Sequence, residues 1–276
     1  MTATALHYDP AFVSAEDRAE IVEWLAGIQP IWERRFTDRA AAAAGGQRKL
    51  LRPVYWLGSW QFACLDYYRP PSGIADRCVE AEPYPAVLAR LVARVEKLAR
   101  SLYRGADMPA RWHLSTCLVN LYGSRLEDGK RIDCARVGEH RDFEPGPVAS
   151  ISLGERALFQ FVKRGKRDEP TRVEAQQWLD DSSLQLFGSD VWKKRLFHRV
   201  LRVDRRGGSR FDVRVPDFET RRVNLTFRYV PDEHVVPFAR LAPRTRDDVR
   251  GYMSELARGS AFFAGQLAAE REGQLA

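Results

Sequence analysis

Hydrophobic positions recur along the chain with two different periods, and the change of period separates three regions. Residues 14–29 and 85–103 place apolar side chains at helical spacing, and residues 245–267 do so again near the end. Between Leu114 and Val230 the pattern changes to short runs rich in β-branched and aromatic residues, separated by polar or glycine-containing turns. We therefore predict a mainly β core with flanking helices, of the sandwich or jelly-roll kind.

Seven of these runs predict strands, namely 114–122, 148–153, 158–162, 184–187, 197–203, 210–215 and 222–230. The last run alternates strictly. One face carries apolar and aromatic side chains, whereas the other carries Arg222, Asn224, Thr226 and Arg228. An isolated strand of this kind is compatible with an ordinary solvated polar face, and also with a face that holds a ligand.

Composition narrows the class of protein. The 276 residues, 45% of them hydrophobic, can supply a sizeable core, and no apolar run approaches the length of a membrane span. The first residues lack the features of a secretory signal, so we expect a cytoplasmic protein with no membrane association. Four cysteines without a close C-x-x-C pair argue against a zinc site or a disulfide framework.

The net charge of +7 is concentrated in one stretch. Residues 193–214 carry nine Lys or Arg against two Asp. This stretch is a candidate phosphate-facing surface, and a solvated basic hairpin is the alternative.

The sequence "GEHRDFEPG" contains a candidate metal site. His140 and Asp142 are two residues apart, so on an extended backbone they share a face. His198 lies on a later predicted strand, which an antiparallel fold can bring beside them. Two imidazoles and one carboxylate form the facial triad of non-haem Fe(II) oxygenases. By itself, however, H-x-D is a common pattern, and either histidine could belong to the core or the surface.

The polar face of the last strand strengthens the metal interpretation. Arg222 and Arg228 lie about 20 Å apart on an extended strand, and their long side chains can converge on a short dicarboxylate. Burying two guanidinium groups without an anion would be costly, so an anionic ligand such as 2-oxoglutarate is expected.

The sequence resembles the AlkB-type Fe(II) and 2-oxoglutarate dioxygenases. The matching pieces are "NLY" at 120–122, "HRD" at 140–142, "ASISLG" at 149–154, "RLFH" at 195–198 and "RVNLTFR" at 222–228. This resemblance implies a double-stranded β-helix core in which His140, Asp142 and His198 bind iron. It further implies a 2-oxoglutarate site made by Asn120, Tyr122, Arg222, Asn224 and Arg228.

The resemblance also implies a substrate and a way to recognise it. Such enzymes use Fe(II), 2-oxoglutarate and O2 for the oxidative demethylation of N-alkylated bases, such as 1-methyladenine or 3-methylcytosine, in single-stranded or flipped-out nucleic acid. Glu144 occupies the position of an acidic residue that helps to read the base, although a surface turn carboxylate is the alternative. Trp56, Trp60, Tyr67 and Tyr68 lie where the nucleotide-recognition lid is expected and could stack on bases. Packing of the N-terminal layer is the alternative for them.

The expected organisation is an N-terminal helical and lid region over 1–112, the dioxygenase core over 113–232, and a C-terminal helical extension over 233–276. Three segments depart from the compact family pattern: the loop 123–139, the basic insertion 204–221 and the C-terminal extension. They could bind nucleic acid, mediate self-association or cover the barrel. An oxygenase of the same fold that acts on a small metabolite or a protein side chain remains an alternative, as does a binding module that has lost catalysis. The sequence does not distinguish DNA from RNA or fix the alkyl group.

Overall fold

Two antiparallel β-sheets form the centre of the protein. The computed structural model describes residues 6–36, 47–49, 52–60, 78–142, 144–165, 170–201 and 210–275. In the larger sheet the strand order is β1 (Leu6–Asp9), β13 (Ser183–Phe187), β10 (Val148–Gly154), β15 (Phe218–Arg228), β7 (Thr116–Glu127) and β4 (Val54–Leu57), and β8 (Lys130–Asp133) also pairs with β7. In the smaller sheet the order is β12 (Arg172–Leu179), β11 (Ala157–Lys163), β14 (Phe197–Leu201) and β9 (Val137–His140). The predicted jelly-roll class is thereby confirmed.

Short strands and six further helical segments complete the described part of the fold. The remaining strands are β2 (Arg34–Phe36), β3 (Gln47–Lys49), β5 (Ser59–Trp60), β6 (Cys78–Glu80) and β16 (Val235–Val236), of which β16 and β6 pair in parallel. The short helical turns are η2 (Gly105–Asp107), η4 (Asp232–His234) and η5 (Phe238–Arg240), together with a π-helical turn, η3 (Asp190–Arg195). The C-terminal helices are α4 (Pro243–Ala257) and α5 (Ala261–Leu275).

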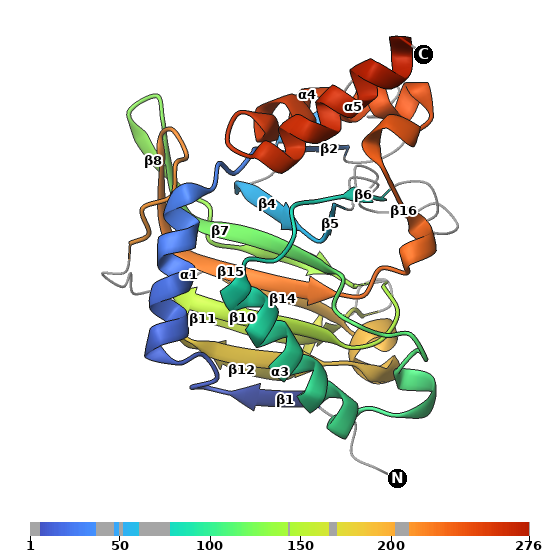
Figure 1. The fold of residues 1–276 in the computed structure, drawn as a ribbon. Helices are drawn as coiled ribbons and strands as arrows, with labels where there is room; N and C mark the ends of the chain where they lie inside the picture. The colour runs from blue at the N-terminus through green and yellow to red at the C-terminus, as the bar shows by residue number, and fades with distance from the viewer. Residues whose placement is uncertain are drawn as a thin grey trace.

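The larger sheet has one apolar face and one polar face. Helices α1 (Ala15–Gly27) and α3 (Ala86–Leu102) lie across the apolar face (Figure 1). There Val223, Leu225 and Phe227 of β15 join one core cluster with buried residues of both helices. The opposite side chains of β15, Arg222, Asn224, Thr226 and Arg228, therefore point toward the smaller sheet. The alternation predicted for this strand is thus observed, and its polar face lines the interior between the sheets.

A β-bulge at Arg221 places the side chains of Arg221 and Arg222, which are neighbours in β15, in different surroundings. The register with β7 shifts between Thr220 and Arg222, so that Thr220 pairs with Gly123 and Arg222 pairs with Tyr122. A Cβ atom at Gly123 would lie 1.8 Å from the carbonyl oxygen of Glu219, so no other residue fits at this position without a shift of the backbone. The bulge lets both arginines be buried in different surroundings.

The predicted helices and strands mostly match the structure, with two corrections. The sequence predicts one helix over 245–267, but the structure has two, because α4 ends at Ala257 and α5 begins at Ala261. Residues 210–215 do not form a strand: Phe211 makes a single bridge to Thr220, and the N–H groups of Val213 and Val215 donate to the carbonyl two residues earlier. Tight turns therefore replace the extended conformation that the alternation of this segment indicated.

Two of the departing segments have a defined structure. Part of the loop 123–139 extends β7 into a hairpin with β8, whose turn residues Asp128 and Gly129 both have positive φ, as a type I′ turn requires. The C-terminal helices pack over the strands before α3. The ring centres of Tyr252 and Trp60 are 6.2 Å apart, and those of Phe263 and Tyr55 are 6.1 Å apart, both pairs in edge-on geometry. The extension therefore covers the N-terminal strands, which was one of its three expected roles.

Two of the described strands before residue 113 belong to the larger sheet, whereas β2 pairs with β3, and β5 pairs with β6. β1 pairs with β13, and β4 pairs with β7, so both belong to the larger sheet. Within the described part of the chain, no helix combines the length and the apolar character needed to cross a bilayer. Cys78, Cys117 and Cys134 are buried free thiols, and Cys64 lies outside the described residues.

Candidate metal centre and cosubstrate pocket

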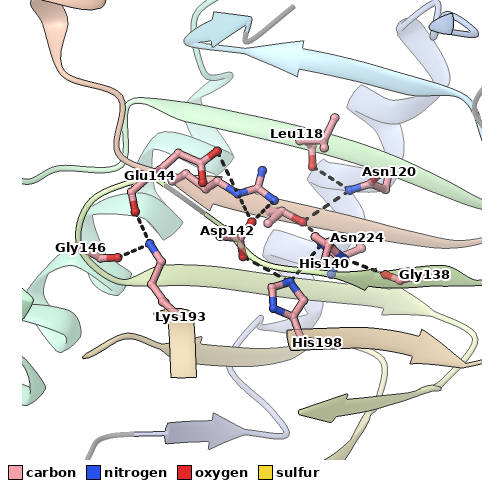
Figure 2. A network of polar contacts seen from close by, with 12 residues as sticks. Leu118, Asn120, Gly138, His140, Asp142, Glu144, Gly146, Lys193, His198 and Asn224 are labelled. Atoms are coloured by element: carbon pink, nitrogen blue, oxygen red, sulfur yellow. Dashed lines mark hydrogen bonds and ion pairs between the residues drawn. The ribbon is translucent and has the colours of Figure 1, made fainter. Parts of the chain in front are cut away.

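His140, Asp142 and His198 lie together between the sheets. β9 ends at His140, which pairs directly with His198 of β14, and Asp142 follows two residues later. The Nε2 atoms of the two histidines are 3.0 Å apart, and His198 Nε2 lies 3.4 Å from Asp142 Oδ2. One ligand atom from each residue falls within 4.8 Å of the others (Figure 2). The fold thus brings together three residues that are up to 58 positions apart in the sequence.

The surroundings favour the protonation states that a metal ion needs. Phe159 stacks on His198 at 5.3 Å, and Phe187 lies 5.5 Å away. Burial lowers the pKa of His198 to about 3 and also lowers that of His140, so both imidazoles are neutral near pH 7. Burial alone would raise the pKa of Asp142, but the positive charge of Arg228 and its neighbours holds it below the ordinary value. Two neutral nitrogens and an ionised carboxylate fit Fe(II).

Arg228 contacts the metal-site carboxylate. Its Nε and Nη2 atoms each lie 2.8 Å from Asp142 Oδ1, and its Nε lies 3.6 Å from Glu144 Oε1. The sequence predicts that Arg228 lies with Arg222 around a dicarboxylate, and this stays a prediction. The contact with Asp142 shows that its guanidinium group can also orient and neutralise the aspartate, as an outer-shell residue of a metal site does.

Asn120, Tyr122, Arg222 and Asn224 form one group on two neighbouring strands. Asn224 pairs with Asn120, and Arg222 pairs with Tyr122, so all four face the interior. The Cζ atom of Arg222 lies 4.7 Å from the centre of the Tyr122 ring, and its Nη2 donates to Ser152 Oγ at 3.0 Å.

Arg222 is the residue of this group best suited to bind an anion. It is 3% exposed, and within the described residues its Nε and Nη1 atoms have no hydrogen-bond partner. Burial lowers its pKa from the ordinary value, although arginine remains charged near neutral pH. A buried cation with two unused donors fits a carboxylate such as that of 2-oxoglutarate.

Asn224 is held in place from two sides. Its Nδ2 donates to Ser150 Oγ at 2.8 Å and to the carbonyl of Ile151 at 3.0 Å, while its Oδ1 accepts from Thr226 Oγ1 at 2.7 Å. The two bonds from Nδ2 tie β15 to β10 and fix the orientation of the Asn224 side chain.

Lys193 is a functional candidate that the sequence did not reveal. It was counted in the basic stretch 193–214, but it lies in the π-helical turn η3 and is only 7% exposed. Its Nζ donates to the carbonyl of Glu144 and, at 2.6 Å, to that of Gly146 (Figure 2). Lys193 therefore secures the segment that follows Asp142, and it is not part of a phosphate-facing surface.

Two other described arginines of the basic stretch have acidic partners. Arg199 Nη1 lies 2.9 Å from Glu139 Oε1, and Arg210 Nε lies 3.3 Å from Glu219 Oε1. Residues 202–209 lie outside the described part of the chain. The described residues therefore provide less free positive charge than the sequence count indicated.

The two tryptophans considered for base stacking are buried. Trp56 and Trp60 are 1% and 0% exposed, and their indole N–H groups donate to Glu33 Oε1 at 2.6 and 2.8 Å. A fully buried ring offers no face to a base, so the packing alternative describes both residues. Tyr67 and Tyr68 lie outside the described residues.

Comparisons with known proteins agree with this geometry. A family model described as the 2OG-Fe(II) oxygenase superfamily matches residues 5–228, whereas no curated protein is matched. Among solved structures, OsALKBH1 gives a TM-score of 0.50 at 20% identity, over 83% of this chain and 100% of that chain. The α-ketoglutarate-dependent epimerase SnoN from nogalamycin biosynthesis gives 0.40 at 11% identity, over 82% and 78% of the two chains. The ribosomal oxygenase YcfD from Escherichia coli gives 0.28 at 12% identity, over 64% and 46%.

The likeness to OsALKBH1 confirms the AlkB-type fold that the sequence motifs indicated. The family match covers both sheets and extends to the last residue of β15. The chain therefore belongs to the 2OG-Fe(II) oxygenase superfamily, whose members are dioxygenases that use Fe(II), 2-oxoglutarate and O2.

Proposed function

We propose that the protein oxidatively demethylates N-alkylated bases in nucleic acid, of the 1-methyladenine or 3-methylcytosine type. The superfamily accounts for the oxygenase chemistry. Two observations support a nucleobase as the substrate: the AlkB-like fold, and a buried carboxylate, that of Glu144, beside the metal triad.

In this proposal the residues of the site have separate tasks. His140, Asp142 and His198 hold the metal ion, and Arg222 anchors the distal carboxylate of the cosubstrate beside Tyr122. Bound Fe(II), with 2-oxoglutarate and O2, supplies hydroxylation of the N-methyl carbon, and the resulting hemiaminal releases formaldehyde. Phe159 and Phe187 keep water from the buried side of His198. The chain thereby fixes the positions of the reacting groups, which is its main contribution in a cofactor enzyme.

Glu144 is the observation that carries the proposal for the substrate. It is 4% exposed, and its Oε2 has no hydrogen-bond partner within the described residues. A buried carboxylate oxygen without a donor is costly, so a ligand that brings a donor would be favoured. The exocyclic amino groups of 1-methyladenine and 3-methylcytosine are such donors, and the adjacent ring cation would add to the attraction.

The test is product release by the Fe(II)-loaded protein. Succinate and formaldehyde would be measured with 2-oxoglutarate, O2 and oligonucleotides that contain either lesion, against unmodified controls. We expect formaldehyde in proportion to base repair. Succinate without lesion-dependent formaldehyde would refute the substrate class and direct the search to metabolite or protein substrates.

A matched pair of variants tests the role of Glu144. Glu144→Gln keeps the size of the side chain but presents an amide, and loss of one charged hydrogen bond should raise KM for the lesion roughly 10–100-fold. Glu174→Gln changes a carboxylate on β12 that pairs with Arg172 at 2.7 Å, and it should leave KM unchanged. Equal KM values for both variants would remove Glu144 from the base-reading role.

A further inference from the structure

A third guanidinium group, that of Arg52, reaches the cosubstrate pocket from the residues just before β4. Its Nε donates to Asn120 Oδ1 at 2.7 Å, and its Cζ lies 5.2 Å from the centre of the Tyr122 ring. Arg222 lies 4.7 Å from the same ring. The two guanidinium carbons are therefore at most about 10 Å apart, on one aromatic ring.

The charge of Arg52 acts toward both the pocket and the metal site. Burial is the main cause that lowers the pKa of Arg222 and of His140, and the positive charge of Arg52 adds to the effect at both groups. Arg52 is partly buried, whereas Arg222 is buried. Arg52 is therefore the more exposed of the two guanidinium groups, and its charge acts on His140, the more exposed of the two histidines.

One dicarboxylate cannot bind both of these guanidinium groups and the metal ion. A 2-oxoglutarate held by Arg222 at one end and by the metal at the other leaves Arg52 without a carboxylate of its own. The Nε of Arg52 is occupied by Asn120, and no described residue accepts a hydrogen bond from its two Nη groups. A guanidinium fixed in this way presents its Nη pair as a fork that fits a single oxyanion.

We propose that Arg52 binds an oxyanion of the primary substrate at the mouth of the pocket. On the proposed function, from which the identity of the substrate is taken, this oxyanion is the backbone phosphate next to the target nucleotide. Among the described residues, Arg52 is better suited to this task than Arg199 or Arg210 of the basic stretch, because both of those pair with glutamates.

The first experiment compares substrates that differ by one phosphate. Formaldehyde release by the Fe(II)-loaded protein would be followed with 1-methyldeoxyadenosine, its 5′-monophosphate and a trinucleotide that contains it. The wild-type protein should prefer the phosphorylated substrates by about tenfold or more in kcat/KM. Arg52→Met should abolish this preference, whereas Arg52→Lys should retain part of it.

Two controls separate this role from a structural one. The KM for 2-oxoglutarate, measured as succinate release without primary substrate, should change in Arg52→Met by a smaller factor than the phosphate preference, because Arg52 contacts the cosubstrate site through Asn120 and Tyr122. Arg18→Met, which removes an arginine that pairs with Asp181 at 2.9 Å on the surface, should behave as wild type in every assay. A raised KM for 2-oxoglutarate with an intact phosphate preference would overturn the proposal and assign Arg52 to the cosubstrate.

A binding measurement distinguishes failure of this proposal from failure of the proposed function. The anisotropy of a fluorescein-labelled, unmodified trinucleotide would be measured without oxygen on protein loaded with Fe(II) and 2-oxoglutarate. Arg52→Met should raise Kd about tenfold. A raised Kd without any demethylation would refute the lesion chemistry and support the oxyanion site, and an unchanged Kd would refute the oxyanion site.

Discussion

Replacing Lys193 with methionine tests whether a buried ammonium group holds the metal-binding segment in place. The Nζ of Lys193 donates to the carbonyls of Glu144 and Gly146, just after Asp142. Burial lowers the pKa of Lys193, while the carboxylates of Glu144 and Asp142 raise it. Methionine fills a similar volume but has no donor, so two buried carbonyl groups would lose their partner.

The expected loss of stability follows from these contacts. A hydrogen bond from a charged group contributes about 1.5–3 kcal/mol, so two of them represent about 3–6 kcal/mol. Removing the buried charge recovers part of its desolvation cost. We therefore expect a net destabilisation of about 2–4 kcal/mol, or a Tm lower by about 5–12 °C for a chain of this size. Displacement of Asp142 should also weaken Fe(II) binding about 10–100-fold, as is usual for an outer-shell residue.

The neighbouring lysine provides the control. Lys194 is exposed and pairs with Asp190 at 2.6 Å, and such a surface pair contributes little, so Lys194→Met should change stability by less than about 1 kcal/mol. Tm would be measured by calorimetry, and metal affinity by anaerobic Fe(II) titration. If Lys193→Met matched Lys194→Met in both measurements, Lys193 would have no role in holding the segment.

Two further predictions concern the other buried charges. Arg222→Met should raise KM for 2-oxoglutarate roughly 30–1,000-fold without loss of stability. Arg221→Met, which breaks the buried ion pair with Glu155, should cost about 3–5 kcal/mol in urea unfolding with an unchanged KM. The hydrogen bond from Arg250 lowers the pKa of Glu270 in the folded protein. The pair therefore stabilises the packing of α4 and α5 at every pH above the carboxylate's pKa in the unfolded chain. This stabilisation is lost as the pH falls through the lower pKa of the folded state. Protection of α4 and α5 against hydrogen exchange, taken relative to the intrinsic rate at each pH, should therefore fall in acid, and Glu270→Gln should remove that pH dependence. Equal pH dependence in wild type and variant would refute the assignment.

The alternating strands could be predicted because their inner and outer faces have different compositions. In β15 every second residue from Val223 to Phe227 joins the apolar core beneath the helices. The residues between them point toward the smaller sheet, where the metal ligands lie. The same period places Asn120 and Tyr122 on the inner face of β7. A period of two is a local property of the backbone, so the sequence is sufficient to assign these faces.

Other site residues depend on contacts that no local pattern encodes. Lys193 lies in a short π-helical turn within a run of basic residues, and only the fold reveals that its Nζ is buried against a segment about 50 positions earlier. Arg52 precedes a short strand and reaches Asn120, 68 positions later. Composition suggested a surface role for Lys193 and gave no role to Arg52, because burial is set by the packing of distant segments.

The placement of Arg228 changes how the pocket selects its ligand. With Arg228 bonded to Asp142, we infer that only Arg222 anchors the distal carboxylate of a dicarboxylate, and the metal takes the other end. Arg222, His140 and His198 lie on paired strands, and Asp142 follows β9 by two residues, so the distance between the two anchors cannot adjust easily. A dicarboxylate one methylene shorter or longer would leave one anchor unsatisfied, and burial makes that costly for Arg222 in particular. Selection for the length of the cosubstrate therefore follows from the same inner strand face that the sequence marks with alternating polar residues.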